Sequence, residues 1–427
     1  VGVTALIILI VLIVGLTTFL KKYSPSKEVT DYKEYYSLSE DDELFVVYDN
    51  EQVQNHAILQ DDEVYVNYQT VHKYLNKRFY WDATEQVLRY VTPDGLINVT
   101  PDSTQYLLGK SSETADHVIA LVRDGEMYLS MSFVQKYTDI HYEVYTDPGR
   151  IVISDQWDDV TYQTVKKNTQ IRQKGGVKSP ILSEIKKGDL VTVLDTVGSW
   201  SKVCSQDGFI GYMKTKAVGS EQDVLYDHNY TEPKFSHITR DKTINMAWHN
   251  VTNVAANNAV QQVLASTSGL TTIAPTWFSL ADTEGNISSI ADADYVNYAH
   301  TAGLEVWAVF RDFHGGTNSY DETYETLRYT SKRAKLEDQV VAAAVAAGVD
   351  GINLDFELIS SKCGVHYVQL VRELSVKCHQ NNLVFSVDNY VPQSYNSHYD
   401  LKEQGIVADY VVIMAYDEHT EGSYEAG

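Results

Sequence analysis

Polar and apolar side chains alternate along the run from Asp350 to Glu357. With the period of two of a β-strand, the apolar side chains share one face and the polar side chains share the other. The apolar set is Ile352, Leu354 and Phe356, and the polar set is Asn353, Asp355 and Glu357. Two carboxyls at this spacing can share one proton, which keeps one of them an acid near neutral pH. Glu357 is placed to protonate the leaving oxygen of a glycosidic bond. A hydrogen-bonded polar plug in a core strand is the structural alternative.

Strand-like and helix-like segments alternate from about residue 241 onward, and they must position this run. The expected strands are Thr243–Trp248, Thr271–Thr276, Glu305–Phe310, Gly351–Glu357, Leu383–Asp388 and Tyr410–Ala415. The clearest helix covers Ser331–Ala347, with Gly348 as its stop. This rhythm is typical of a parallel α/β sheet or a (β/α)₈ TIM barrel, whose active sites lie at the carboxyl ends of the strands. Since a barrel needs eight such units, we expect an α/β barrel truncated after strand 6.

The acidic run resembles the D-x-x-D-x-D-x-E signature of family 18 glycoside hydrolases, the chitinase-like enzymes. The resemblance extends from about Asp241 to the end of the chain. It implies that Glu357 is the acid and that Asp355 positions the N-acetyl group of the substrate. Asp350 matches the first Asp of the signature. Asn353 departs from the second Asp, because an amide keeps the shape and a hydrogen bond but loses the charge.

A second motif, Met414-Ala415-Tyr416-Asp417, resembles the M-x-Y-D of the sixth strand in the same family. The resemblance implies that Tyr416 hydrogen-bonds the N-acetyl oxygen and that Asp417 helps to bind the sugar. Met414 shares a face with Tyr416 and is a further candidate for substrate binding.

Three aromatic residues stand at or just after other strand ends. Trp277, in the segment Pro275-Thr276-Trp277-Phe278, could stack on a sugar ring or merely cover the top of the barrel. The same two alternatives are open for Trp248 and Tyr390.

The mechanism implied by the resemblance is retaining and assisted by the substrate. The acetamido oxygen attacks the anomeric carbon while Glu357 donates its proton, and Asp355 and Tyr416 hold the acetamide. No cofactor and no metal are required. The expected partner is an N-acetylated glycan, either peptidoglycan or a chitin oligomer. A non-catalytic protein that binds cell-wall carbohydrate, or a surface scaffold, is the alternative.

Two smaller domains are expected before the barrel, over 45–157 and 160–220, with the barrel domain itself over 241–427. The first holds a weak repeat, in which Glu63–Tyr74 resembles Glu126–Tyr137. It resembles the stalk domain found at the N-terminus of copper amine oxidases, and no copper is implied. The second carries Gly188-Asp189, Gly198-Ser199-Trp200 and Gly208-Phe209-Ile210-Gly211-Tyr212, and it resembles the bacterial SH3-like barrel. In that family the barrel binds cell-wall peptide or acts as a spacer.

The first 20 residues contain no charged side chain, and as a helix they would span a bilayer core about 30 Å thick. We expect a transmembrane anchor over 1–20, with a cleaved signal peptide as the alternative, followed by a polar linker over 21–44. Lys21 and Lys22 alone would favour a cytoplasmic C-terminal side. The nature of the later domains favours the extracellular face of a bacterial, Gram-positive cell.

The composition excludes some partners. The chain has 58 acidic and 34 basic residues and a formal charge of −24. Binding to nucleic acid needs clustered Lys and Arg, so neither nucleic acid nor an anionic lipid surface is expected as a partner. Cys204, Cys363 and Cys378 do not form a disulfide framework, and we expect all three to be free thiols.

Overall fold

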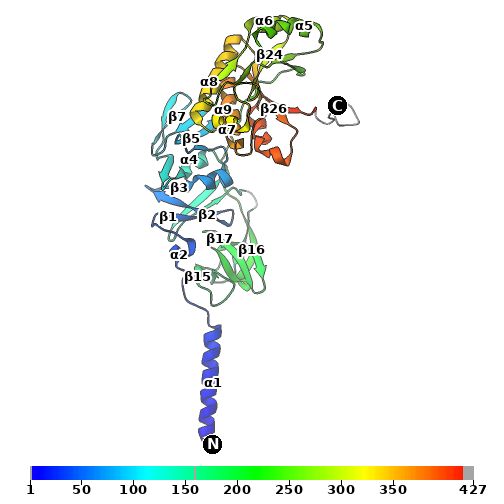
Figure 1. Ribbon diagram of the computed structural model, residues 1–427. Coiled ribbons are helices and arrows are strands. Elements are labelled where there is room, and N and C mark those ends of the chain that lie inside the picture. The colour runs from blue at the N-terminus through cyan, green and yellow to red at the C-terminus, as the bar shows by residue number, and fades with distance from the viewer. Residues whose placement is uncertain (1, 158–159, 417–427) are drawn as a thin grey trace. The chain divides into compact units, whose positions relative to one another are not determined.

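The computed structural model describes residues 2–157 and 160–416, and their side chains from residue 9 onward (Figure 1). The chain forms two compact units. The first joins Val1–Lys77 to Leu121–Glu232, and the second joins Arg78–Ala120 to Pro233–Gly427. The predicted stalk segment 45–157 is therefore divided between the two units. The predicted domain boundaries stay predictions.

The N-terminal segment is helical, as expected. Helix α1 covers Gly2–Tyr23, with Lys21 and Lys22 in its last turn, where positive charge favours the helix dipole. In the part of the chain that the structure describes, no helix is long and apolar enough to cross a membrane. The predicted anchor over 1–20 is therefore not supported, although the side chains of residues 1–8 lie outside the described residues.

The first unit contains a mixed sheet with the order β11-β12-β1-β2-β3-β10-β9. Its strands are β1 (Glu43–Tyr48), β2 (Glu51–Gln60), β3 (Glu63–Asn67), β9 (Ala120–Arg123), β10 (Glu126–Ser130), β11 (His141–Thr146) and β12 (Gly149–Ser154). Its short helices are α2 (Tyr32–Tyr36), α3 (Tyr68–Thr70), η1 (Val71–Leu75) and α4 (Met131–Lys136). The internal repeat is visible here, because β3 and β10 pair and each leads directly into a short helix.

The second sheet of this unit has the order β15-β14-β18-β17-β16-β13-β19. Its elements are β13 (Val160–Val165), β14 (Thr169–Arg172), β15 (Ile181–Ile185), β16 (Leu190–Val197), β17 (Trp200–Ser205), β18 (Ile210–Lys214), η2 (Thr215–Ala217) and β19 (Val218–Val224). Gly188, Gly198 and Gly208 have positive φ, so the glycines of the predicted SH3-like pattern supply its turns. Cys204 is buried and free, as are the other two cysteines.

A parallel sheet forms the centre of the second unit. Its main path runs β20-β21-β24-β25-β26-β27, in chain order, and neighbouring strands along it are parallel. The strands are β20 (Met246–His249), β21 (Thr272–Pro275), β24 (Glu305–Arg311), β25 (Gly351–Asp355), β26 (Val384–Tyr390) and β27 (Tyr410–Met414), with the side pair β22 (Phe278–Leu280) and β23 (Ile287–Ser289). These six strands overlap the six expected ones. Whether the barrel is truncated after strand 6 stays a prediction.

Helices connect the strands and cover the sheet. They are η3 (Val254–Ala259), α5 (Val260–Ala265), α6 (Ala293–Thr301), α7 (Tyr320–Leu327), α8 (Thr330–Ala347), α9 (Gly364–Gln380), η4 (Ser394–Tyr399) and α10 (Leu401–Val407). Helix α8 ends at Gly348, whose φ of 76° confirms the predicted stop. Its buried residues include Leu336, Val340 and Ala344, which join the core beneath the sheet.

An antiparallel sheet from the predicted stalk segment belongs to this same unit. It consists of β4 (Tyr80–Asp82), β5 (Val87–Thr92), β6 (Gly95–Val99), β7 (Gln105–Leu108) and β8 (Ser111–Thr114), in that order. Helix α9 contacts β5 and β6 (Figure 1). The backbone N–H of Thr330, at the start of α8, donates to Asp82 at 2.8 Å, so β4 supplies the cap of that helix.

A buried ionic cluster fixes the antiparallel sheet to helices α8 and α9. Nη1 of Arg89 lies 2.7 Å from Oε1 of Glu373, and Nε of Arg333 lies 3.0 Å from Oε2 of the same carboxylate. All three residues are buried. Burial alone would raise the pKa of Glu373, but Arg333 and Arg89 hold it below its usual range. The charge of Glu373 is therefore compensated from two different elements.

We expect Glu373→Gln to lower the free energy of unfolding of the second unit by about 3–5 kcal/mol, because it leaves Arg89 and Arg333 buried without their counter-charge. Chemical denaturation measures the change. The matched control is Glu325→Gln, whose partner Arg328 is partly exposed, and a loss of about 1 kcal/mol or less is expected there. Equal losses in the two variants would contradict the assignment.

Candidate active site

Strand β25 carries the polar face that the alternation predicts. Ile352, Leu354 and Phe356 are buried in the hydrophobic core. On the other face, Asn353 is fully buried, and its amide nitrogen donates to Oγ of Ser386 and to Oδ1 of Asp388, both at 2.9 Å. The predicted division of the strand into two faces is thus confirmed.

Four carboxyl groups gather at the carboxyl ends of β24, β25 and β26. They belong to Asp312, Asp355, Glu357 and Asp388. Burial raises the pKa of Asp355 to about 8, assisted by the negative charges of Asp388, Glu357 and Asp312 and opposed by Arg311. Asp355 is therefore protonated at neutral pH, so the cluster keeps a proton beside Glu357.

Asp312 shapes the loop that carries Glu357. Its side chain is fully buried, and its two oxygens accept the backbone N–H groups of Glu357 at 2.9 Å and Leu358 at 3.0 Å. The hydroxyl of Thr323 donates to it as well, at 3.1 Å. Burial raises the pKa of Asp312 to about 6, while these donors pull it down. Asp312 therefore sets the direction in which the chain leaves β25.

Two tyrosines hold Glu357 from the side of β26. The hydroxyl of Tyr390, the last residue of that strand, donates to the Glu357 carboxylate. The hydroxyl of Tyr399 lies 3.3 Å from the backbone oxygens of Phe356 and Glu357. Tyr390 thus contacts the carboxylate of Glu357. Of the two roles that the sequence left open for Tyr390, the structure favours a place in the site over a mere cover for the top of the barrel.

Trp248 lies at the open end of the same group. Its Nε1 donates to Oδ1 of Asn353 at 3.0 Å and to Oδ2 of Asp388 at 3.1 Å. The residue is 43% exposed, so part of the indole remains accessible beside the carboxyl cluster. An exposed indole over a polar site is suited to stacking on the apolar face of a ring.

Two predicted binding residues lie elsewhere. Asp350 precedes β25 and stands at its amino end, where its carboxylate accepts from the N–H of Val306 and meets Nε2 of His300, both at 2.8 Å. That end is opposite to the carboxyl cluster, and the substrate-binding role predicted for Asp350 stays a prediction. Trp277 is 2% exposed, and its Nε1 donates to Asn257 at 2.8 Å. Its ring belongs to the core and is not available for stacking on a sugar.

The second motif is only partly described. Met414 ends β27 and is buried, and the hydroxyl of Tyr416 lies 3.1 Å from its Sδ. Tyr416 is 64% exposed. Asp417 lies outside the described residues. The predicted roles of Met414, Tyr416 and Asp417 stay predictions.

The sequence pattern alone did not predict that Asp312, Asp388 and Arg311 belong to the site. A signal was present for the first, because Arg311 and Asp312 follow the apolar run Val306–Phe310 directly. Asp388 was placed at the end of an expected strand without a role. Among the described residues, no group of three or more His, Cys, Asp or Glu side chains is arranged to hold a metal ion.

We expect Asp312→Asn to lower the free energy of unfolding by roughly 1.5–3 kcal/mol, because the two N–H groups bind different oxygens of Asp312 and one of these becomes an NH2 donor in the variant. The amide resonances of Glu357 and Leu358 should shift in the NMR spectrum. Asp321→Asn is the control, since that carboxylate is exposed and its ion pair is with Lys362. An unchanged Glu357 resonance in Asp312→Asn would overturn the positioning role.

Models of three known families match parts of the chain. Residues 313–427 match the model of glycosyl hydrolases family 18, residues 167–219 match the bacterial SH3 domain, and residues 47–153 match the copper amine oxidase N-terminal domain.

Individual relatives cover only parts of the chain. A protein described as an uncharacterized glycosylase, YvbX of Bacillus subtilis (strain 168), is 26% identical over 145 residues, which is 32% of this chain and 42% of that protein. The chain thus spans less than half the length of this curated relative.

Two solved structures show partial likeness. The chitinase from Chromobacterium violaceum ATCC 12472 is 20% identical with a TM-score of 0.36, over 42% of this chain and 57% of that one. The Bacillus cereus spore cortex-lytic enzyme SleL is 22% identical with a TM-score of 0.38, over 48% and 46%.

The family matches agree with the acidic run on β25 and with the glycine-rich turns of the second sheet. The C-terminal part of the chain is therefore a domain of glycosyl hydrolases family 18, joined to a bacterial SH3 domain and a copper amine oxidase N-terminal domain.

Proposed function

We propose that this protein hydrolyses a β-linked glycan containing N-acetylglucosamine, of the peptidoglycan or chitin type, by a retaining mechanism that the substrate assists. The family match supports glycosidase chemistry. One observation carries the choice of an N-acetylated sugar, and it concerns Asp355. Oδ1 of this carboxyl is buried and has no hydrogen-bond partner among the described residues.

A buried acceptor without a partner is unfavourable unless a ligand supplies a donor. The N–H of an acetamido group is such a donor. Because the pKa of Asp355 is raised to about 8, its carboxyl carries a proton at neutral pH and still has an oxygen free to accept. It can hold the acetamide N–H while sharing its proton with Glu357.

The proposed reaction has two steps. The acetamido oxygen attacks the anomeric carbon, and the bond to the leaving oxygen breaks as Glu357 gives that oxygen its proton. The oxazolinium intermediate is positively charged, and the carboxyl cluster stabilises it. Water opens the intermediate and returns a proton to Glu357. In this proposal Tyr416 and Asp417 contact the sugar, and Trp248 stacks on a neighbouring ring.

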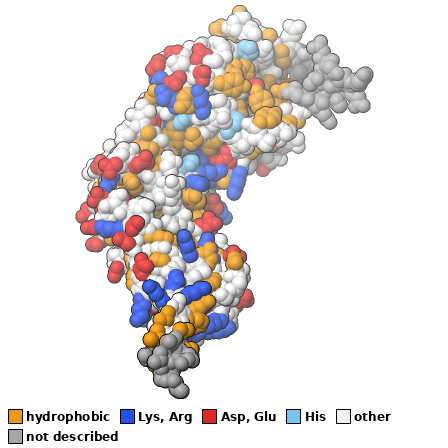
Figure 2. Space-filling model, turned by 60° about the horizontal axis from the view of Figure 1, so that its bottom comes forward, with side chains coloured by type: hydrophobic (Ala, Val, Ile, Leu, Met, Phe, Trp, Pro, Cys, Tyr) orange, Lys and Arg blue, Asp and Glu red, His pale blue; other side chains and the backbone are white. Residues whose placement is uncertain are grey.

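The surface charge is consistent with a neutral or amino-sugar polymer. Acidic side chains occur in several separate places on the face shown in Figure 2, in keeping with the formal charge of −24. Repulsion of phosphate disfavours nucleic acid. Since such glycans are polymers of the cell exterior, we propose an extracellular location for the domain.

We expect Glu357→Gln to lower kcat on an N-acetylglucosamine oligomer by about 10² to 10⁴-fold, because the variant lacks the acidic proton. Binding of the same oligomer should persist, since Gln is nearly isosteric. Turnover and equilibrium binding are measured in parallel, with Glu325→Gln as the control of equal charge change. Near-normal turnover by Glu357→Gln would remove Glu357 from the reaction and favour a carbohydrate-binding role.

The rate of hydrolysis should also fall as the pH rises through about 8, because Asp355 then loses the proton that it shares with Glu357 in this proposal. Asp388→Asn removes a negative charge that raises the pKa of Asp355, so the basic limb of the kcat/KM profile should move to lower pH. The control variant Asp321→Asn should leave that limb in place. A limb that moves to higher pH in Asp388→Asn would contradict the assignment of the titrating group.

A further inference from the structure

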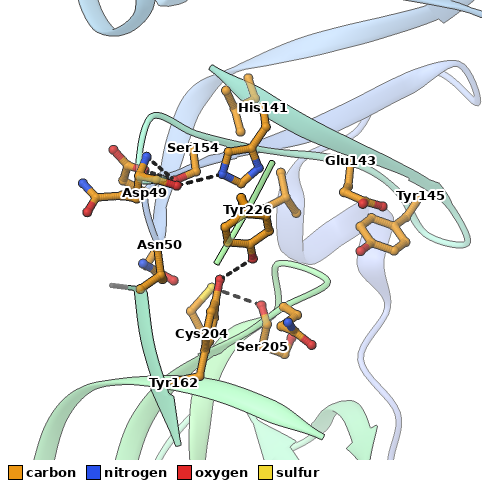
Figure 3. Close-up of a pocket in the computed structure, with 15 residues that line it drawn as sticks. Asp49, Asn50, His141, Glu143, Tyr145, Ser154, Tyr162, Cys204, Ser205 and Tyr226 are labelled. Atoms are coloured by element: carbon orange, nitrogen blue, oxygen red, sulfur yellow. Dashed lines mark hydrogen bonds between the residues drawn. The ribbon is translucent and has the colours of Figure 1, made fainter. Parts of the chain in front are cut away.

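A cavity in the first unit is lined by acidic and aromatic side chains, whereas the carboxyl cluster of the candidate active site belongs to the second unit. It lies between strands β11 and β12 of the mixed sheet and strands β13 and β17 of the SH3-like sheet, with Tyr226 beside it (Figure 3). Its volume is about 260 Å³. That is below the range of roughly 300–1,000 Å³ typical of pockets for whole small molecules. The cavity suits one functional group on a short stem.

Carboxylates and hydroxyls supply many of the polar groups that line the cavity, beside the amides of Asn50, Gln156 and Gln206 and the imidazole of His141. Carboxylates come from Asp49 and Glu143, and hydroxyls come from three tyrosines and two serines. These residues are Tyr145, Tyr162, Tyr226, Ser154 and Ser205. Among the described lining residues there is no Lys or Arg. An anion would meet repulsion here, whereas a cation with N–H donors would meet acceptors.

The negative charge at this cavity is incompletely compensated. Oδ1 of Asp49 accepts the hydroxyl of Ser154 at 2.6 Å. Burial raises the pKa of Asp49, and the neighbouring Asp155 raises it further. The nearby cation Arg150 is already engaged, because its Nη2 lies 2.9 Å from Asp207 and its guanidinium stacks on Tyr145 at 4.4 Å.

Aromatic faces form another part of the wall. The ring of His141 stacks on Tyr226 with centroids 4.3 Å apart and planes inclined by 27°. The hydroxyls of Tyr226 and Tyr162 lie 2.8 Å apart, so these rings are held in place. Fixed phenol rings attract a cation through their π faces, by an amount comparable to a modest hydrogen bond.

From these observations we propose that this cavity binds a primary ammonium group carried on a short alkyl stem. The three N–H donors of such a group match the carboxylate and hydroxyl acceptors, and its methylene stem matches the tyrosine rings. A quaternary ammonium has no N–H donor and would leave the acceptors unpaired. This proposal does not depend on the hydrolytic activity.

The test uses the full chain and Nα-acetyl-lysinamide as the probe, with binding followed by NMR or calorimetry. The neutral Nα,Nε-diacetyl-lysinamide and the Nε-trimethyl analogue have the same stem. Binding of the primary amine at least about tenfold tighter than either analogue is expected. Equal binding of all three, or no binding of the primary amine, would overturn the proposal.

Variants locate the site. Glu143 is exposed on β11, so Glu143→Gln should leave the fold intact. Combined with Asp49→Asn, it should weaken binding of the primary amine by about tenfold or more, since hydrogen bonds to charged groups are lost. Glu221→Gln removes one charge on the SH3-like sheet, outside the cavity, and should leave the affinity unchanged. If Glu143→Gln alone has no more effect than Glu221→Gln, the ammonium does not bind in this cavity.

Discussion

Crowding of like charges at the ends of three neighbouring strands is the constraint on which the candidate active site depends. This cluster consists of Asp312, Asp355, Glu357 and Asp388. The four carboxyl groups cannot all ionise in a site that is largely shielded from water, because each negative charge disfavours ionisation of its neighbours. Hydrogen-bond donors from several elements contact these carboxyl groups and hold them in place. The backbone after β25 binds Asp312, and the indole of Trp248 together with the amide of Asn353 binds Asp388. Asp355 is left with a proton as its means of losing charge.

A carboxylate is also buried at helices α8 and α9, but there it keeps its charge. There the buried carboxylate of Glu373 stays ionised, because Arg89 and Arg333 approach it from two sides. Asp355 keeps a proton, whereas Glu373 keeps its charge, because two arginines form ion pairs with Glu373. Arg89 comes from a strand that precedes helices α8 and α9 by more than two hundred residues. Long-range charge compensation thus makes the antiparallel sheet a structural part of the second unit.

The local alternation of polar and apolar residues predicted the strands well. It predicted poorly which residues distant in the sequence contact each other. The alternation around Asn353 and Asp355 defined both faces of β25, since a period of two needs no tertiary information. Trp277 was left open, because a strand-end aromatic can point into the core or toward solvent, and only packing decides. Asp350 contacts His300 and Val306 at the amino end of β25, and a signature that counts spacing does not reveal these contacts. Arg333 of α8 is fully buried, and a helical pattern cannot reveal that another sheet covers this position.

The division of the chain into units has a consequence for proteolysis. The backbone passes between the two units at residues 77–78, 120–121 and 232–233. A single cut near residue 233 would therefore not release the second unit intact, because the segment that holds β4 to β8 remains covalently joined to the first unit on both sides. A fragment that starts at residue 241 would lose those strands and leave Glu373 facing one arginine instead of two. Release of the intact second unit requires three separate cleavages, so one proteolytic cut does not separate the two units completely.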